Sequence, residues 1–260
     1  MSALLTSLNA QGVATLTLNK PAVHNAFDDS LIAELNHSIE SYAKNPLVRL
    51  LILRSEGKSF SAGADLGWMK RMASFSQAEN LADAQELEKL MRNLYGFPKP
   101  TVCIVQGATF GGAVGLVSCC DIAIASDQAS FSLSEAKLGL APAVISPYVI
   151  AAIGARQASR FFLTAERFTA ETALTLGLIH QLHSAETLQA KADELISALL
   201  NNGPIALMAC KALLRKISPA DSPEIREFTT TLIANLRTSQ EGQEGLAAFF
   251  EKRAPSWQKI

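Results

Sequence analysis

The sequence predicts an α/β fold, with strands and helices mixed through the first part of the chain and helices alone towards its C-terminus. Two apolar runs, Leu50–Leu53 and Val102–Val105, are continuous rather than alternating, which is typical of strands covered on both faces of a sheet. Helical spacings separate these runs, and after Leu182 only helical spacings remain. We therefore expect a core over residues 1–183 and a helical region over residues 184–260, with no tandem repeat or low-complexity linker.

The first elements each carry a signal of their own. Val13–Leu18 has the alternation of a half-buried strand. Asp28 or Asp29 can cap a helix whose apolar residues recur at helical spacing, because a carboxylate accepts hydrogen bonds from the free N–H groups of the first turn. Ser76 and Glu79 have the spacing of a capping box ahead of another helix with an apolar stripe.

The remaining elements follow from the same patterns. Short strands are expected at Ile122–Ala125, Phe131–Leu133 and Ile179–Leu182. Helical patterns run through residues 188–200, 205–217, 223–236 and 246–252, and breaks at Asn202-Gly203-Pro204, Ser218-Pro219 and Thr238-Ser239 separate them.

The composition excludes several classes of protein. A chain of 260 residues with 48% hydrophobic residues can fill a large core, and a formal net charge of −1 argues against a broadly basic nucleic-acid-binding protein. No signal-peptide pattern and no apolar run of membrane-spanning length is present, so we expect a soluble, unprocessed protein. The cysteines lie in apolar runs without metal-ligand spacing, and we expect buried, reduced thiols in a cytoplasmic protein at Cys103, Cys119, Cys120 and Cys210.

Two small, glycine-bearing turns carry the strongest functional signal. They are Phe60–Asp65 and Gly107–Gly112, and each follows an apolar strand-like run. Either turn alone could simply join a strand to a helix. Together they can bring two free backbone N–H groups to one point, because residues without bulky side chains let a ligand oxygen approach the main chain. The pair therefore predicts an oxyanion hole.

These turns belong to a longer series of motifs that resembles the enoyl-CoA hydratase/isomerase (crotonase) family over nearly the whole chain. The matching pieces are Leu18–Pro21, His24–Ala26, Ser61–Asp65, Pro98–Pro100, Gly107–Asp121, Ser134-Glu135, Leu138–Pro142 and Gly177–Ile179. Within the family the chain is most similar to a bacterial branch that hydrates carboxylated enoyl-CoAs, through Trp68–Met72, Glu79–Ala84 and Pro142–Tyr148. The resemblance implies a spiral of ββα units followed by a helical trimerisation region, and a homotrimer or a dimer of trimers.

The resemblance also implies the catalytic groups. The N–H groups of Ala64 and Gly112 polarise the thioester carbonyl of an acyl-CoA, where negative charge develops as an enolate forms. Glu135 carries the proton, and burial in an apolar pocket would raise its pKa towards neutrality. Many hydratases of the family have a second glutamate at the position of Gly115, which this chain lacks, and Gly115 is expected to lie in the substrate site. Ala143 stands where a backbone N–H of relatives helps to position the water, and its own N–H is expected to be available for that role.

One carboxylate is compatible with two reactions. A hydratase could take a proton from water and return it to the α-carbon, whereas the Δ3,Δ2-enoyl-CoA isomerases of the family move a proton between two carbons with a glutamate at the position of Glu135. The branch resemblance favours a hydratase of 3-methylglutaconyl-CoA or isohexenylglutaconyl-CoA, in leucine/isovalerate or acyclic terpene breakdown, without a metal or a cofactor apart from the CoA of the substrate. A CoA-binding scaffold is a further alternative, against which Glu135 argues. RNA binding is disfavoured because residues 79–92 mix acidic with basic side chains.

For CoA, the resemblance implies backbone contacts to the adenine and cationic partners for the phosphates. The expected backbone contacts are Ala62, Ala64, Asp65 and Leu66, with Ala22 and Val23 nearby. The expected cations are Lys70, Arg71 and, from a neighbouring subunit, Lys252, although a lysine or arginine on a helix is usually only solvated. His24 is interpreted as a hydrogen-bonded structural histidine near the ligand.

Overall fold

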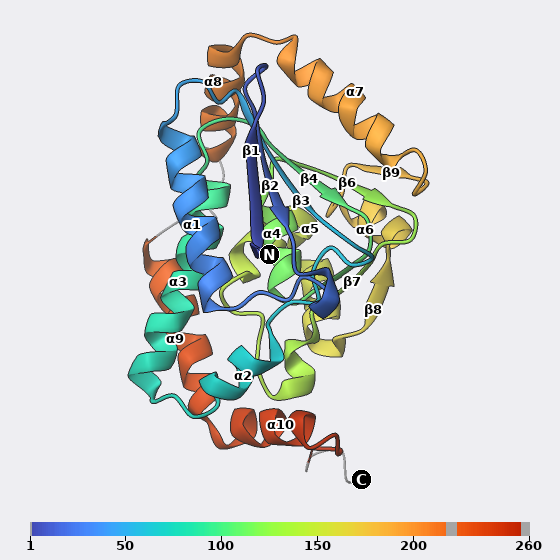
Figure 1. Ribbon diagram of the computed structural model, residues 1–260. Coiled ribbons are helices and arrows are strands. Elements are labelled where there is room, and N and C mark those ends of the chain that lie inside the picture. The colour runs from blue at the N-terminus through green and yellow to red at the C-terminus, as the bar shows by residue number, and fades with distance from the viewer. Residues whose placement is uncertain (1, 217–222, 256–260) are drawn as a thin grey trace.

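The protein is described here by a computed structural model that covers residues 2–216 and 223–255. Within this part, a six-stranded sheet runs through the molecule in the order β1-β2-β3-β4-β6-β9 (Figure 1). Its pairs are parallel except β1 with β2, which is antiparallel. The strands are β1 (Leu4–Leu8), β2 (Val13–Leu18), β3 (Leu50–Ser55), β4 (Thr101–Val105), β6 (Ile122–Ser126) and β9 (Gln181–His183).

A second, three-stranded sheet lies beside the first and is built from β5 (Ala108–Phe110), β7 (Ser130–Ser132) and β8 (Arg167–Thr169). β5 runs parallel to β7, and β8 is antiparallel to it. The segment expected to be a glycine-bearing turn thus contains a short strand before its two final glycines. These glycines begin α4 (Gly112–Cys119) directly after β5.

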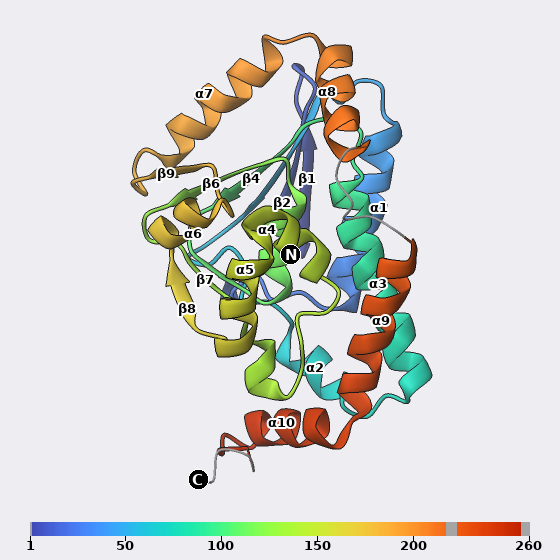
Figure 2. The ribbon, with the colours of Figure 1, turned by 180° about the vertical axis from the view of Figure 1, so that it is seen from behind.

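Helices cover both faces of the larger sheet. Figures 1 and 2 show α1 (Asp29–Lys44), α3 (Gln77–Tyr95) and α9 (Pro223–Thr238) side by side along one flank, with α10 (Gln240–Phe250) below α2 (Leu66–Met72). The other helical segments are η1 (Pro21–Val23), η2 (Ser134–Leu138), α5 (Ser146–Thr164), α6 (Ala170–Leu176), α7 (Leu188–Leu200) and α8 (Pro204–Lys216).

The two continuous apolar strands are covered on both faces, as their sequence predicts. In β3, Leu51 faces the main core with α1, α3 and α4, whereas Ile52 packs in a smaller core on the opposite face. There it meets Leu188 and Ala192 of α7. Burying every residue of a strand requires apolar side chains at successive positions, which removes the usual alternation.

The helix-start signals are confirmed. The Asp28 side chain accepts a hydrogen bond from the Leu31 N–H, and Ser76 and Glu79 form the complete capping box of α3. The expected helix over 246–252 is wrong at its start, because α10 begins at Gln240 after the Ser239 cap, and two glycines in its first turns hide its periodicity. No element was expected at α5, where Gly154 with φ of 77° interrupts the helical spacing.

The expected last strand, 179–182, begins at Gln181 instead. The final residue of the helix expected over 205–217 lies outside the described residues, and so does the expected Ser218-Pro219 break.

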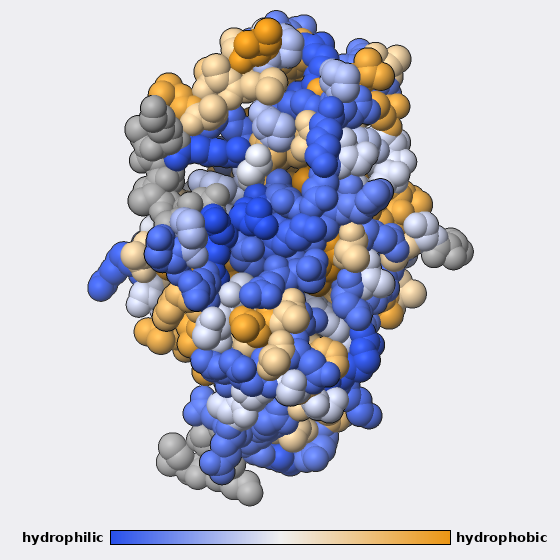
Figure 3. Space-filling model, turned by 90° about the vertical axis from the view of Figure 1, so that its left-hand side faces the viewer, coloured by the Kyte–Doolittle hydropathy of each residue, from blue (hydrophilic) through white to orange (hydrophobic). Residues whose placement is uncertain are grey.

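α8 exposes much of its apolar surface, including Ile205, Leu213 and Leu214. Cys210 on this helix is exposed as well, so the expectation of four buried thiols is wrong for that one. In Figure 3 hydrophilic residues cover the middle of the flank and hydrophobic residues gather towards its upper end.

No single helix in residues 2–216 and 223–255 is long and apolar enough to cross a membrane. The bent pair formed by residues 188–200 and 204–215 meets the criterion on length and composition alone.

Candidate active site

A cavity of about 840 Å³ opens between the start of α4, η2 and the C-terminal helices α9 and α10. Its walls come from the loop after η1, from the Ala62–Leu66 turn, from the start of α4, and from η2, α2, α3, α9 and α10. α10 is held close to η2 by glycines, because a Cβ on Gly245 would collide with the Leu138 carbonyl and one on Gly139 would lie 2.6 Å from the Glu241 carbonyl oxygen. The C-terminal helices of the chain therefore form part of its own cavity.

The two glycine-bearing turns of the sequence meet at this cavity. Ser61 forms a parallel bridge with Thr109, in which the Ser61 N–H donates to the Ala108 carbonyl at 3.1 Å and the Phe110 N–H donates to the Ser61 carbonyl at 3.0 Å. Gly63 follows with φ of 89°, and its Cα passes so close to Phe110 that an added Cβ would lie 2.8 Å from the Phe110 oxygen. Only glycine fits both conditions.

The bridge leaves two backbone N–H groups without a partner in the described part of the chain. Around Ala64, the Phe27 N–H donates to the Gly63 carbonyl and the Asp65 N–H donates to the Phe27 carbonyl, so the Ala64 N–H between them is free. The Gly112 N–H is free because it belongs to the first residue of α4. Both residues line the cavity. Two such donors, together with the positive end of a helix, can stabilise an oxyanion.

Gly111 and Gly112 have different reasons for being glycine. Gly111 adopts φ of 56° and ψ of −126°, a conformation that L residues with side chains rarely adopt, and a Cβ there would lie 3.3 Å from Glu135 Oε1. At Gly112 a Cβ would lie 2.6 Å from Cζ of Phe27, a buried side chain that also lines the cavity. The two glycines let the carboxylate and the ring approach the start of α4.

Glu135 lies in η2 and its carboxylate faces the same cavity. Its Oε2 atom is buried and has no hydrogen-bond partner in the described residues. Burial raises the pKa of Glu135 to about 7, and a hydrogen bond from its own backbone N–H lowers that pKa in part. A carboxyl group with this pKa can accept and return a proton near neutral pH.

The expectation that the Ala143 N–H is free is wrong. Ala143 lines the cavity, but its N–H donates to the Ala141 carbonyl at 2.7 Å across Pro142, and its own carbonyl accepts from the Ser146 hydroxyl. Proline fixes φ near the value that such a three-residue turn requires at its centre. The turn therefore uses the N–H that was expected to position water.

Gly115 does not line the cavity. A Cβ at this position would lie 2.7 Å from the Ile145 Cβ, still closer to the Ile145 Cγ2, and 3.2 Å from the Met91 sulfur. Ile145 does line the cavity, and it fills the space in which a side chain at position 115 would lie. Gly115 is therefore a packing position under Ile145, and the expectation that it lies within the ligand site is wrong.

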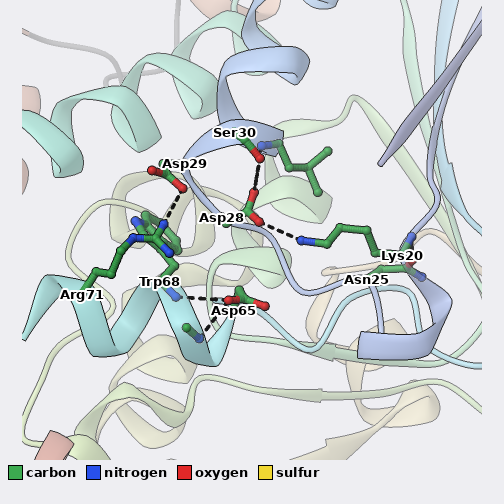
Figure 4. Close-up of polar contacts among 10 residues, drawn as sticks. Lys20, Asn25, Asp28, Asp29, Ser30, Asp65, Trp68 and Arg71 are labelled. Atoms are coloured by element: carbon green, nitrogen blue, oxygen red, sulfur yellow. Dashed lines mark hydrogen bonds and ion pairs between the residues drawn. The ribbon is translucent and has the colours of Figure 1, made fainter. Parts of the chain in front are cut away.

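The residues expected to contact CoA are only partly brought together. Val23, Ala62, Asp65 and Leu66 line the cavity, whereas Ala22, Lys70 and Arg71 do not. The role of Lys252, expected from a neighbouring subunit, stays a prediction. Figure 4 shows how Asp65 and Arg71 are used locally: the Asp65 carboxylate accepts from the Gly67 and Trp68 N–H groups at the start of α2, and Arg71 forms an ion pair with Asp29 at 2.7 Å. His24 Nδ1 lies 3.0 Å from the Ser59 hydroxyl, as expected of a hydrogen-bonded histidine, and the residue also lines the cavity.

Sequence reasoning missed a buried arginine in the cavity wall. Arg237, on α9, forms an ion pair with Asp83 of α3 at 2.7 Å, and the two side chains are 8% and 11% exposed. Burial lowers the pKa of Arg237, and Asp83 raises it in turn. The signal was available, because Arg237 stands one helical turn after Ile233 on the buried stripe of its helix, where a charged residue is unusual.

Among the described residues, no group of three or more histidine, cysteine, aspartate or glutamate side chains could hold a metal ion. The groups in the cavity that are available for proton transfer and oxyanion binding are the Glu135 carboxyl and the N–H groups of Ala64 and Gly112, since the other carboxylate in the wall, Asp65, caps α2.

Comparison with known proteins agrees with this geometry. Residues 9–259 match the model of the enoyl-CoA hydratase/isomerase family. The chain is 31% identical to a 2,3-dehydroadipyl-CoA hydratase of Escherichia coli over 99% of both chains, and 32% identical to a trans-2-decenoyl-[acyl-carrier-protein] isomerase of Streptococcus mutans over 95% of this chain and 94% of that one. A solved enoyl-CoA hydratase structure from Shewanella pealeana superposes with a TM-score of 0.81 at 49% identity, over 98% and 96% of the two chains.

A crotonase-type α/β spiral thus surrounds a cavity in which the unpartnered carboxyl group of Glu135 lies with two free backbone donors. The chain belongs to the enoyl-CoA hydratase/isomerase family, and it is an enzyme of the enoyl-CoA hydratase type.

Proposed function

We propose that this enzyme adds water across the 2,3 double bond of an enoyl-CoA thioester whose acyl group carries a carboxylate, such as 3-methylglutaconyl-CoA or isohexenylglutaconyl-CoA. These compounds occur in leucine/isovalerate and acyclic terpene breakdown, and no cofactor is needed beyond the CoA of the substrate. The observation that carries the reaction is the unpartnered, buried Oε2 of Glu135 in the same cavity as two free backbone N–H groups.

In this mechanism the thioester oxygen lies between the N–H groups of Ala64 and Gly112. Glu135 takes a proton from water while the hydroxide adds at C3, and the electron pair of the double bond moves onto the thioester oxygen as an enolate. Loss of one such backbone donor typically costs about 3 kcal/mol of barrier. Glu135 then returns the proton to C2, so the carboxylate is regenerated and water is consumed.

The carboxylated substrate is supported by the branch resemblance and by a relative named as a 2,3-dehydroadipyl-CoA hydratase. The position of Gly115 adds to this support, because Ile145 covers the place of a second glutamate and leaves that part of the wall uncharged. A substrate carboxylate would meet no like charge there.

The second candidate is a Δ3,Δ2-enoyl-CoA isomerase. Two observations favour it: a single carboxyl group can move a proton between two carbons, and the Ala143 N–H is not available to hold a water. A relative named as an isomerase is 32% identical to this chain.

Mass spectrometry of products from a panel of 2-enoyl- and 3-enoyl-CoAs tests both candidates. We expect hydration of the carboxylated 2-enoyl-CoAs, and Glu135→Gln should lower kcat by about 100-fold while acyl-CoA binding is nearly unchanged. Glu186→Gln, at an exposed carboxylate outside the cavity, is the matched control. Conversion of 3-enoyl- to 2-enoyl-CoA without any hydration would assign the isomerase activity instead.

We also propose that the protein acts in the cytoplasm as a homotrimer or a dimer of trimers, with the C-terminal helices at the contact between subunits. The exposed apolar side chains of α8, together with the exposed Phe228 of α9, support this proposal because single-chain proteins rarely expose contiguous apolar surface. Light scattering coupled to size-exclusion chromatography measures the number of chains, and a monomer at micromolar concentration would contradict it.

A further inference from the structure

Four basic side chains line the cavity in the described part of the chain, and they differ in how far their charge is already used. Arg253 donates to both oxygens of Glu244, to Glu251 and to the Ala254 carbonyl. Lys137 and His24 are exposed at the surface. Arg237 alone is buried.

Most of the hydrogen-bonding capacity of Arg237 is unused. Its guanidinium donates through Nη1 to Asp83 Oδ2 at 2.7 Å, and no other acceptor for it lies in the described residues. The Nε and Nη2 atoms of Arg237 are not fully buried and keep accessible surface. Arg237 lines the cavity. A guanidinium has five donors in a planar fork that fits a carboxylate.

A third side chain, that of Trp68, orients the ion pair. Asp83 accepts from the Trp68 indole N–H at 2.9 Å as well as from Arg237, so its two oxygens are both used. Trp68 lies against Phe27, with ring centroids 6.4 Å apart, and Phe27 touches the start of α4 at Gly112. This contact series joins Arg237 to the proposed oxyanion hole through the buried rings of Trp68 and Phe27.

The surroundings of Arg237 are otherwise apolar. Met72 of α2, Leu87 of α3 and Ile233 of α9 line the cavity on the elements that hold the Arg237–Asp83 pair. An acyl chain can pack against these side chains, and a buried arginine with free donors at their edge provides a place for one anionic group.

We propose that Arg237 binds the carboxylate carried by the acyl group of the substrate and so selects acidic acyl-CoAs over neutral ones. The inference rests on the proposed function and names the residue responsible for its substrate class. Asp83 positions the guanidinium through Nη1 and leaves its other donors to the substrate. Because Asp83 also partly neutralises Arg237, it limits the strength of that contact.

Binding of saturated acyl-CoAs tests this role without turnover. By calorimetry, wild-type protein should bind glutaryl-CoA at least about 10-fold more tightly than butyryl-CoA, as a charge-assisted hydrogen bond would give. Arg237→Met should reduce this preference to near parity. Arg226→Met is the matched control, because Arg226 lies on the same helix and pairs with Glu88 of α3 but does not line the cavity, and it should keep the preference.

Asp83→Asn separates ligand binding from a purely structural ion pair. Asparagine has one acceptor oxygen, so it can accept from Arg237 only if its NH2 group faces Trp68 and the hydrogen bond from the Trp68 indole is lost. The substitution also removes the competing negative charge, so the preference for glutaryl-CoA should increase by several-fold. A structural pair alone predicts that Arg237→Met and Asp83→Asn both lower the melting temperature and that neither changes the preference. That result, or equal affinities in the wild type, would overturn the proposal.

The outcome is distinguishable from that of the proposed reaction. If wild-type protein prefers glutaryl-CoA through Arg237 but hydrates no enoyl-CoA, the binding role stands and the hydratase proposal fails. If it hydrates crotonyl-CoA and shows no preference for an acidic acyl group, the binding role of Arg237 fails. The hydratase reaction then stands, but the carboxylated substrate class does not.

Discussion

Ile145 fills the space beside Gly115 that a side chain at position 115 would need, since a Cβ there would lie 2.7 Å from the Ile145 Cβ. The position without the second glutamate is thus part of a packed pair. Gly115 has no side chain, and Ile145 occupies the space beside it and lines the cavity with an apolar group.

Gly115→Ala should lower the free energy of unfolding by about 1–3 kcal/mol, because the added methyl group overpacks a buried contact. Ile145→Ala removes the opposing Cγ2, so the double variant should be more stable than the sum of the two single effects predicts. Urea unfolding of the four proteins measures this coupling. Strict additivity would show that the backbone of α4 moves to accept the methyl group.

Gly115→Glu in an Ile145→Ala background should shift the ratio of kcat/KM from carboxylated substrates towards crotonyl-CoA. A carboxylate at position 115 would repel a substrate carboxylate in a desolvated cavity. The ratio is the informative quantity, because the substitution changes the packing for both substrates. Gly115→Gln in the same background is the uncharged control, and an equal shift in both variants would assign the effect to shape.

The raised pKa of Glu135 predicts opposite pH trends for activity and stability. As a base, Glu135 acts in its ionised form, so kcat/KM should rise as the pH increases through about 7. For stability, the folded-state pKa of Glu135 lies above its ordinary value. The free energy of unfolding that Glu135 contributes is therefore fully present below about pH 4 and is lost as the pH rises through about 7.

Glu135→Gln mimics the protonated side chain and should therefore be more stable than wild type at pH 8, by about 3 kcal/mol, with no difference near pH 4. Thermal unfolding of both proteins across this range gives the comparison. A constant difference between them would mean that the carboxyl group does not change its ionisation with folding.

Gly111→Ala should lower both stability and turnover. The substitution forces a non-glycine residue to adopt φ of 56° with ψ of −126°, and it crowds Glu135 Oε1. Gly154→Ala is the matched control, since Gly154 also has positive φ, at 77°, but nothing lies within 4 Å of its Cβ position. We expect both variants to lose about 1–3 kcal/mol of unfolding free energy and only Gly111→Ala to lose kcat by a further 10-fold or more.

Truncation before Gly203 should give aggregated or unfolded chain. It removes α9, whose Ile233 and Ala234 are buried against α3, and α10, which packs on η2 around Glu135. The exposed apolar surface would favour association. Light scattering and circular dichroism measure the result, and a soluble, active monomer would contradict the prediction.

The sequence by itself determined the local structure and the candidate chemistry. Capping residues such as Asp28 and Ser76 fixed helix starts, and the continuous apolar runs fixed which strands lie inside. These signals are local, because a cap or a periodicity is complete within one element. The motifs around Ala64, Gly112 and Glu135 identified the groups that the structure brings to one cavity.

Only the tertiary structure decided how those groups are used. The bridge of Ser61 with Thr109 aligns two turns nearly fifty residues apart, Ile145 covers Gly115, and the turn at Pro142 engages the Ala143 N–H. Arg237 reaches the cavity because α9 packs against α3. Each of these relationships joins residues through space or through a particular backbone conformation, and residue type and spacing along the chain do not specify which atoms then remain free.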